Sequence, residues 1–345
     1  MVIYKNMKEE YDVVIIGAGP GGLSCGLELQ KAKKSVLILE RNKEIGPKVC
    51  AGGLTTKIKN LGLSLDIAEI LFSSIKISFQ RKEKIISGNN PFVATIDREK
   101  LGKIMLEKLS DSIEIKTCSE VVKIDNNFIE VNNQIIKYKY LVGADGGNSI
   151  VRKFLGLRTK KILITLQYII PEQFKELELS INSALFGWGY AWIFPHKGYT
   201  AIGCCRDKRF LRGLSLKNSF DKWLKNKNIK VEGIDLQGGI INFDYQGFDF
   251  GNKFLVGDAA GFASGITGEG IYFAMVSGKE IAKRIIDPTY KTTEIDKILK
   301  IKHIQELPLT ILPLLNSSLL SLFFKFSFFL FNFKWFRNKL FKVYS

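Results

Sequence analysis

Tyr11-Asp-Val-Val-Ile-Ile-Gly-Ala-Gly-Pro-Gly-Gly22 is the stretch that decides the fold. Residues 13–16 are apolar and β-branched, which is typical of a strand buried in a parallel sheet. The glycines that follow have the spacing Gly17-x-Gly19-x-x-Gly22. Gly17 permits a tight turn, Gly19 leaves room for a pyrophosphate beside the backbone, and Gly22 lets the next helix pack on the sheet. This pattern predicts a dinucleotide-binding site.

The residues after the glycine motif support the same prediction. A helix over residues 21–33 would direct its N-terminal N–H groups at the phosphates. A second apolar strand over residues 35–39 ends in Glu40, at about the 20-residue spacing expected of the carboxylate that binds a ribose hydroxyl. A glycine-rich turn that binds nothing has no need of this acid, so we expect a bound dinucleotide.

Composition and charge limit the possible partners. The chain has 345 residues, and its hydrophobic content of 46% is normal for a packed core. Lys and Arg number 51 against 34 Asp and Glu, which gives a net charge of +17. This balance suits nucleic acid, an anionic membrane surface or an acidic protein, and it is equally expected of a lysine-rich chain with solvated side chains. No basic block is interleaved with aromatic residues, so we expect no nucleic-acid partner.

Cysteine and histidine usage narrows the chemistry. The five cysteines include no Cys-x-x-Cys pair, and the adjacent Cys204 and Cys205 suit neither a disulfide nor a common metal spacing. Because His196 and His303 are the only histidines, we expect neither a metal site nor a Ser-His-Asp hydrolase. The first apolar run is the nucleotide-binding strand rather than a signal segment, which indicates a cytoplasmic protein.

Residues 44–54 form an irregular loop that we expect beside the dinucleotide. Gly52 and Gly53 remove bulk where a flat ring must pass close to the backbone. Cys50 opens this glycine turn and is either a proton donor or a small packing residue.

The chain then returns towards the nucleotide-binding sheet. Arg98 stands at the start of a predicted helix with one apolar face, and it meets either a phosphate or a surface carboxylate. Residues 113–115, 120–124 and 128–131 predict the strands of a small meander, with asparagine pairs in the turns.

Two later strands end in acids. Asp145 and Asp258 each follow an apolar run, and ligands gather at the carboxyl ends of parallel strands. Glycines at 265, 268 and 270 precede a long predicted helix over residues 271–286. Such glycines expose backbone N–H groups and the positive end of a helix to a ligand. An ordinary strand–loop–helix connection is the plainer interpretation.

Residues 55–95 and 158–248 show short alternating segments and contain no second glycine fingerprint. They predict a second, antiparallel domain. Within it, Tyr190, Trp192 and Phe194 alternate, so a strand places all three on one face. That face is either plain core or the wall of an apolar substrate cavity.

The character of the chain changes after residue 307. Residues 307–345 carry five basic residues and no acid. The charge-free part, residues 307–324, includes two prolines and lies at the short edge of the roughly 17–25 residues that span a bilayer. We expect helices that cover the substrate cavity or lie in the membrane interface. A transmembrane helix and a buried helical hairpin are the alternatives.

Four of these motifs occur together: the glycine fingerprint, Glu40-Arg41, the Asp145-Gly motif and Gly257-Asp258. In this combination the chain resembles the FAD enzymes of the hydroxybenzoate-hydroxylase fold type. Two further stretches, Pro47-Lys-Val-Cys-Ala-Gly-Gly-Leu54 and Tyr190-x-Trp192-x-Phe194-Pro195, look like the geranylgeranyl reductase family. Members of that family hydrogenate isoprenoid double bonds. The resemblance covers about residues 10–290.

The resemblance implies a mixed α/β fold in which a Rossmann-like FAD-binding domain is interleaved with an antiparallel-sheet substrate domain. The FAD-binding domain would comprise residues 1–54, 96–157 and 249–288. The substrate domain would comprise residues 55–95 and 158–248, and residues 289–345 would form C-terminal helices that face a membrane or cover the cavity.

The same resemblance implies the site residues. Tyr190, Trp192 and Phe194 would line a prenyl tunnel, and Cys50 would lie near the flavin ring as a candidate catalytic residue. The FAD-binding set would be Gly17, Gly19, Pro20, Gly22, Glu40, Arg41, Cys50, Ala51, Gly52, Arg98, Asp145, Asp258, Gly265, Gly268 and Gly270.

The implied activity is saturation of C=C bonds in the prenyl chain of a lipid, diphosphate or quinone, by hydride from reduced flavin plus a proton. The electron donor would be NADPH, NADH or reduced ferredoxin, because FAD takes the one dinucleotide fingerprint. The protein would sit peripherally at the inner face of the cell membrane. The alternatives are an FAD-dependent monooxygenase or epoxidase of the same fold, and a prenyl-lipid-binding flavoprotein without turnover.

Overall fold

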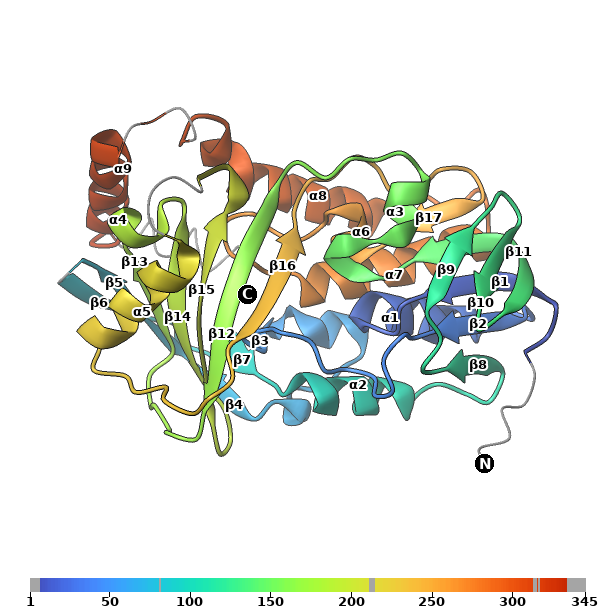
Figure 1. The fold of residues 1–345 in the computed structure, drawn as a ribbon, viewed down its shortest axis with the longest axis horizontal. Coiled ribbons are helices and arrows are strands. Elements are labelled where there is room, and N and C mark those ends of the chain that lie inside the picture. Colours follow the sequence, from blue (N-terminus) through green and yellow to red (C-terminus); the bar gives the residue numbers. More distant parts are fainter. Residues whose placement is uncertain (1–6, 81, 211–214, 313–314, 316, 334–345) are drawn as a thin grey trace.

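The computed structural model describes residues 7–80, 82–210, 215–312, 315 and 317–333. It contains two seven-stranded sheets that lie beside one another and are joined by a three-stranded sheet (Figure 1). Helices cover one face of the first sheet and extend from it to the second. The predicted mixed α/β fold with C-terminal helices is confirmed.

The first sheet is built around β1 (Glu10–Ile16), as the opening motif predicts. β1 pairs in parallel with β2 (Val36–Leu39) on one side and with β11 (Gln134–Gly143) on the other. β17 (Lys253–Leu255) extends the parallel set beyond β11. Since β1, β2, β11 and β17 run in the same direction, Gly17, Glu40, Asp145 and Asp258 follow their carboxyl ends at one edge of the sheet.

The predicted meander is correct in two strands and wrong in the third. β9 (Val121–Ile124) and β10 (Phe128–Val131) form antiparallel pairs that continue to β11. β8 (Ile113–Lys116) instead pairs in parallel with β2 at the opposite edge of the sheet. Adjacent strands in the sequence suggested a hairpin series, but β8 follows helix α2 (Arg98–Leu106), and a helical crossover brings a strand back parallel.

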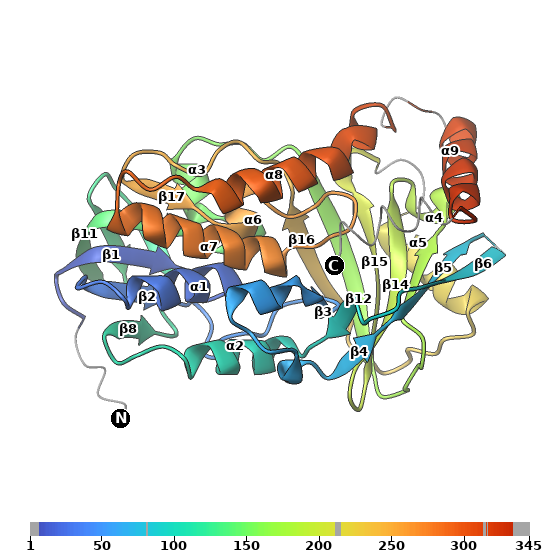
Figure 2. The ribbon, with the colours of Figure 1, turned by 180° about the vertical axis from the view of Figure 1, so that it is seen from behind.

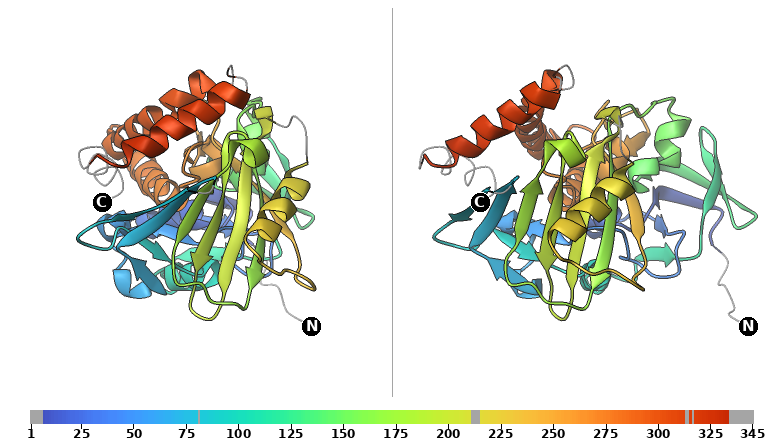
Figure 3. Two further views of the ribbon diagram at one scale, coloured as in Figure 1. Left: turned by 90° about the vertical axis from the view of Figure 1, so that its left-hand side faces the viewer. Right: turned by 60° about the vertical axis from the view of Figure 1, so that its left-hand side comes forward.

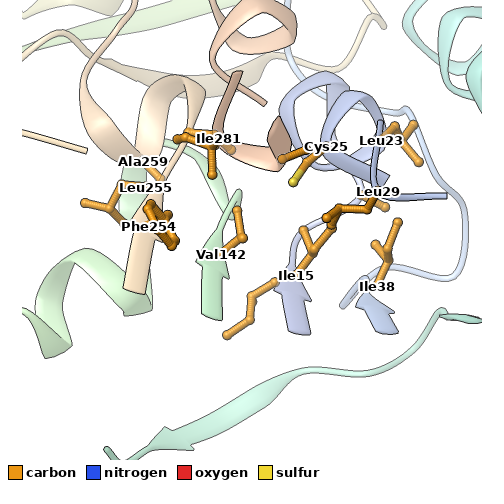
Figure 4. Packing of buried hydrophobic residues seen from close by; sticks show 14 of the residues in the cluster. Ile15, Leu23, Cys25, Leu29, Ile38, Val142, Phe254, Leu255, Ala259 and Ile281 are labelled. Atoms are coloured by element: carbon orange, nitrogen blue, oxygen red, sulfur yellow. The ribbon is translucent and has the colours of Figure 1, made fainter. Parts of the chain in front are cut away.

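Helices α1 (Pro20–Leu29) and α7 (Ile271–Ile286) pack on the same face of this sheet. Their backbones approach so closely that a Cβ at Gly278 would lie 2.1 Å from the carbonyl oxygen of Gly21. The Ser24 hydroxyl donates a hydrogen bond of 2.8 Å to the Met275 carbonyl across the same crossing. Figure 4 shows side chains of α1 and α7 packed over the strands beneath them.

The extent of α1 corrects one prediction. The expected helix over residues 21–33 ends at Leu29, and the chain turns through Ala32, whose N–H donates to the Leu29 carbonyl. The predicted α7, in contrast, has the expected bounds.

The second sheet has the strand order β16-β12-β15-β14-β13-β5-β6 and is antiparallel except between β13 and β5. Its strands are β5 (Ser74–Phe79), β6 (Lys82–Ser87), β12 (Ile162–Ile170), β13 (Glu178–Ile181), β14 (Gly189–Pro195), β15 (Thr200–Asp207) and β16 (Gln237–Asn242). The third sheet joins β3 (Gly53–Thr55), β7 (Val93–Thr95) and β4 (Ile70–Phe72). It therefore follows directly on the loop that carries Cys50.

Shorter helices complete the connections. They are α3 (Ile150–Phe154), α4 (Ser183–Phe186), α5 (Leu216–Asn226) and α6 (Gly257–Ala260), with 3-10 turns over Thr56–Leu61, Leu65–Ile67, Gly146–Asn148, Lys208–Phe210 and Leu307–Thr310.

The C-terminal helices leave the first sheet and reach the second. α8 (Thr293–Glu306) packs along α7, as Figure 2 shows from behind. α9 (Ser317–Leu330) lies against α4 and β5 at the far end of the molecule (Figure 3). In the described part of the chain, no helix has the length and hydropathy needed to cross a bilayer. The expected basic residues Lys334, Arg337 and Lys339 lie outside the described residues.

Candidate cofactor and substrate site

The three glycines of the turn after β1 have different surroundings. Gly17 has φ +102°, and a Cβ there would lie 2.4 Å from the Ala144 carbonyl oxygen. A Cβ at Gly22 would lie 2.0 Å from the Gly17 carbonyl oxygen. A Cβ at Gly19 would meet no atom within 4 Å. Packing therefore requires Gly17 and Gly22, whereas the space at Gly19 is open at the start of α1, as a pyrophosphate needs.

Glu40 is tied to this turn. The Ala18 N–H donates to Glu40 Oε2 at 3.0 Å, and the Asn42 N–H donates to Oε1 at 2.9 Å. The carboxylate is thereby held at the end of β2, half-buried beside the glycine turn. Arg41, the next residue, is exposed.

Arg98 lies against the first turn of α1. Its side chain is 9% exposed, and Arg98 together with Gly19 and Pro20 lines a small hollow of about 10 Å³. The buried Nε of Arg98 has no hydrogen-bond partner, and none of the described carboxylates pairs with its guanidinium. The sequence analysis gave two possible partners for Arg98, a phosphate and a surface carboxylate. A cation in this position at the start of α1 suits the phosphate better.

Asp145 supplies the complementary acceptor. Its Oδ2 accepts the Ile150 N–H at 2.6 Å, while its Oδ1 is buried without a partner. Burial raises the pKa of this carboxyl, against the opposing effect of hydrogen bonds from Ser149 and Ile150. An unpartnered donor and an unpartnered acceptor on either side of the glycine turn fit a ligand that carries both phosphates and hydroxyls, and FAD is such a ligand.

Asp258 is the second residue of α6, shortly after β17, and it faces the second glycine loop, which comprises residues 265–270. A Cβ at Gly270 would lie 3.2 Å from Asp258 Oδ1. Lys48 Nζ forms an ion pair of 2.8 Å with Asp258 Oδ2 and so joins the Cys50 loop to this acid. Sequence reasoning missed Lys48, although it lies two residues before Cys50 in the family-like stretch.

The second glycine loop is held from two sides. Gly268 has φ +67°, and the Tyr190 hydroxyl donates to the neighbouring Thr267 carbonyl at 2.6 Å. On the other side, the Gly265 N–H donates to Glu306 Oε1 at 2.8 Å.

Glu306 belongs to α8 and is paired with the buried Lys302. Lys302 Nζ also donates to the carbonyls of Phe243, at 2.9 Å, and Ala263, at 2.7 Å. Burial lowers the pKa of this amine. No sequence signal pointed to these two residues, because they lie 32 (302 − 270) and 36 (306 − 270) residues after Gly270 and reach the loop only through the packing of α8.

Glu269 was also missed, although it stands inside the motif Gly268-Glu-Gly270. Its Oε1 accepts the Thr55 hydroxyl at 3.1 Å. Burial raises the pKa of this carboxyl to about 7, and the Thr55 hydrogen bond and the charge of Lys57 oppose the shift. Glu269 therefore joins the second glycine loop to β3.

The Cys50 turn has the tight geometry that its glycines predict. Cys50 is half-buried, and its Sγ accepts the Gly52 N–H at 3.4 Å. Gly52 has φ +72°, and its carbonyl accepts the Ile96 N–H at 3.0 Å. A Cβ at Gly53 would lie 2.6 Å from Cε2 of Phe194, so the aromatic strand presses directly on this turn.

Tyr190, Trp192 and Phe194 lie on one face of β14. The ring centroids of Tyr190 and Trp192 are 6.1 Å apart, and all three side chains belong to one apolar cluster together with Ala51. Phe324 of α9 belongs to the same cluster and stacks on Trp188 at 5.2 Å. The structure thus brings the aromatic face, the Cys50 turn and the C-terminal helix together.

Comparisons with known proteins also indicate an FAD-binding protein. A family model described as an FAD binding domain matches residues 10–228. An uncharacterized protein of Methanosarcina barkeri is 31% identical over 307 residues, which are 84% of this chain and 78% of that protein. A digeranylgeranylglycerophospholipid reductase of Methanocaldococcus jannaschii is 28% identical over 315 residues, 82% of this chain and 79% of that protein.

The fold also recurs in solved structures. A geranylgeranyl bacteriochlorophyll reductase-like protein of Thermoplasma acidophilum superposes with a TM-score of 0.76 at 23% identity. The superposition covers 91% of this chain and 90% of that chain.

We predict that Gly19→Ala weakens FAD binding at least about tenfold while the free energy of unfolding of the FAD-free protein changes by less than about 0.5 kcal/mol. The reason is that the added methyl group enters only the open space at the start of α1, and Gly19 has an extended backbone that alanine adopts. Flavin titration followed by fluorescence measures the affinity. Gly22→Ala is the matched control, and it should destabilise the fold itself by about 1–3 kcal/mol.

We further predict that Glu269→Gln removes a pH dependence of stability. The pKa of Glu269 rises from 4.5 to about 7 on folding, so the stability contributed by its neutral carboxyl is complete below pH 4.5 and is lost as the pH rises through about 7. Between pH 4.5 and 8 the free energy of unfolding of the native protein should fall by about 3 kcal/mol more than that of the variant. Denaturant unfolding at several pH values measures the difference. The exposed Glu107→Gln should keep the native profile, and parallel profiles for all three proteins would contradict the assignment.

Proposed function

Because the chain belongs to the FAD-binding domain family and, within it, to the geranylgeranyl reductases, we propose that this FAD-dependent oxidoreductase saturates C=C bonds of a prenyl chain carried by a lipid, a diphosphate or a quinone. The observation that supports the substrate class is the contact of the aromatic face with both the Cys50 turn and the second glycine loop. Phe194 lies against Gly53, and Tyr190 binds the loop at Thr267. An apolar chain on this face would therefore lie beside the cofactor.

Each part of the site has a task in such a reaction. When bound, reduced FAD supplies the hydride. The rings of Tyr190, Trp192 and Phe194 orient the apolar chain and exclude water, because an isolated alkene is a poor hydride acceptor and reacts only in a fixed, dry contact. The Gly265–Gly270 loop directs the start of α7 at the site, where its N–H groups stabilise negative charge. The Cys50 thiol, or a water molecule in its place, delivers the proton.

The same features suit three electron donors. FAD takes the one dinucleotide fingerprint, so NADPH or NADH would dock transiently. The net charge of +17 also suits an acidic ferredoxin. The purified flavoprotein is incubated in parallel with NADPH, NADH and reduced ferredoxin. The loss of flavin absorbance shows which of the three reduces it.

We predict that anaerobic incubation with reductant adds two hydrogens per reduced bond to a geranylgeranyl lipid, as measured by mass spectrometry. Cys50→Ser should lower turnover at least about tenfold, because an alcohol is a weaker acid than a thiol. Cys118→Ser, at an exposed position, is the matched control and should keep native turnover.

Each of the other results has a definite meaning. Product formation that requires oxygen would establish a monooxygenase or epoxidase instead. Bound lipid of unchanged mass would establish a carrier without turnover. Native turnover of Cys50→Ser would show that a water molecule, and not the Cys50 thiol, donates the proton.

We also propose that α9 attaches the protein to the inner face of the cell membrane. One side of α9 packs into the molecule through Leu320, Phe324 and Phe328. The other side exposes Leu322, Phe326 and Phe329 to 61%, 59% and 52%. Residues 307–345 carry five basic residues and no acid, which suits anionic headgroups beside an apolar helix face.

We predict that replacing Leu322, Phe326 and Phe329 with serine reduces binding to vesicles of anionic phospholipid at least about tenfold, because each exposed ring or leucine contributes about 1.5–3 kcal/mol when it is buried in lipid. Vesicle co-sedimentation measures the binding, and flavin content verifies the fold. Val122→Ser with Ile135→Ser removes exposed apolar side chains from the opposite end of the molecule and should leave binding unchanged. Equal sedimentation of both variants would contradict the assignment of α9.

A further inference from the structure

The tip of the β14–β15 hairpin carries a buried acid–base pair that lies next to the Cys50 turn. His196 follows β14, is 3% exposed, and places its Nδ1 2.6 Å from Glu69 Oε2. Its Nε2 lies 3.0 Å from the Ala51 carbonyl oxygen. Figure 1 shows the hairpin end beside β4 and β7 of the small sheet, and the Thr95 hydroxyl donates to the Pro195 carbonyl at 2.8 Å in the same place.

The hydrogen-bond partners of His196 orient its ring. A carbonyl oxygen only accepts, so Nε2 carries the hydrogen that is donated to Ala51. The Glu69 carboxyl holds the other ring nitrogen, Nδ1, and thereby fixes the direction of the Nε2–H group.

The surroundings of the pair are closed by further polar groups. The Tyr199 ring stacks on the imidazole with a centroid distance of 4.5 Å, and its hydroxyl donates to Asp97 Oδ2 at 3.1 Å. Burial raises the pKa of Tyr199, and the charges of Asp97, Glu69 and Cys50 raise it further. The pair thus stands between the Cys50 turn and the N-cap of the helix that begins with Arg98.

The pair holds the centre of the Cys50 turn. Ala51 is the residue between Cys50 and Gly52, and its carbonyl is the group that His196 binds. The next carbonyl, of Gly52, accepts the Ile96 N–H at 3.0 Å. A Cβ at Gly52 would lie 2.6 Å from Cε1 of His196, so the imidazole also fills the side of the turn. Two successive carbonyls are held by hydrogen bonds, and they fix the backbone of the turn that carries Cys50.

We propose that His196 is a positioning residue: its Nε2–H clamps the Ala51 carbonyl, a hydrogen bond between Nδ1 and the Glu69 side chain holds the ring, and the Cys50 thiol is thereby set in place in the site. The consequence for catalysis rests on the function proposed above for Cys50. The clamp itself is measured without turnover, so its failure and the failure of the proposed function are separate results.

Packing alone does not account for this ring. A buried polar group costs free energy unless it is hydrogen-bonded, so an apolar ring of similar size would fill the same space without that requirement. What distinguishes histidine from an apolar ring is a directed N–H at Ala51. The experiments below therefore compare donors with rings that lack them.

The protonation is tested by NMR of ¹⁵N-histidine in the FAD-bound protein. The chain has two histidines, so His303→Gln assigns both signals. At pH 7.5 Nε2 of His196 should have the shift of a protonated ring nitrogen. An unprotonated Nε2 in the native protein would overturn the donor to Ala51.

The clamp is tested by alkylation of Cys50 with iodoacetamide. Cys25, Cys204 and Cys205 are buried, so Cys118→Ser gives a protein in which Cys50 is the accessible thiol. In this background His196→Phe keeps the ring but loses the donor to Ala51, and the high-pH plateau of the alkylation rate should rise at least about fivefold as the turn opens. Glu69→Gln leaves the Nε2–H donor in place and should remain within about twofold of the native rate.

Two controls complete the comparison. Tyr199→Phe keeps the ring stack, loses the hydrogen bond to Asp97 and should leave the Cys50 rate within about twofold. His196→Gln retains one donor and should give an intermediate rate, which serves if His196→Phe fails to fold. Native alkylation rates in His196→Phe, or in His196→Gln where that variant replaces it, would overturn the clamp.

Discussion

Two backbone contacts that only glycine permits hold the nucleotide-binding half of the molecule together. The Gly17 carbonyl occupies the place of a Cβ at Gly22, and the Ala144 carbonyl occupies the place of a Cβ at Gly17. β1, α1 and the end of β11 are thereby brought to a separation that no larger residue allows. The start of α1 then faces the edge of the sheet at which Glu40 and Asp145 stand. The remaining features of the site depend on this placement.

The charged groups around that edge are arranged in pairs or held ready for a ligand. Lys48 neutralises Asp258, and Lys302 with Glu306 supports the second glycine loop from α8. Arg98 and Asp145 instead keep one buried polar atom each without a partner. Leaving such an atom unpaired costs about 1–3 kcal/mol. A ligand that completed these hydrogen bonds would recover that cost.

The second half of the site is apolar and reaches the first half through β14. Phe194 lies on Gly53, Tyr190 is bound to Thr267, and His196 is bound to Ala51, so β14 and the residue after it contact both the Cys50 turn and the second glycine loop. The buried side of α9 packs on the same apolar cluster through Leu320, Phe324 and Phe328, and its other side is exposed.

The sequence by itself determined the local parts: the strand–turn–helix around Gly17, the acids that end parallel strands, the bounds of α7 and the shared face of Tyr190, Trp192 and Phe194. These follow from short-range rules, namely glycine spacing, apolar periodicity and strand alternation. Tertiary structure alone decided that β8 pairs with β2, that α8 supplies Lys302 and Glu306, and that His196 and Glu69 meet at Ala51. Those residues lie far apart in the chain, and each looks ordinary in its own segment. Their meaning comes from low-dielectric contacts that exist only after the sheets and helices have packed.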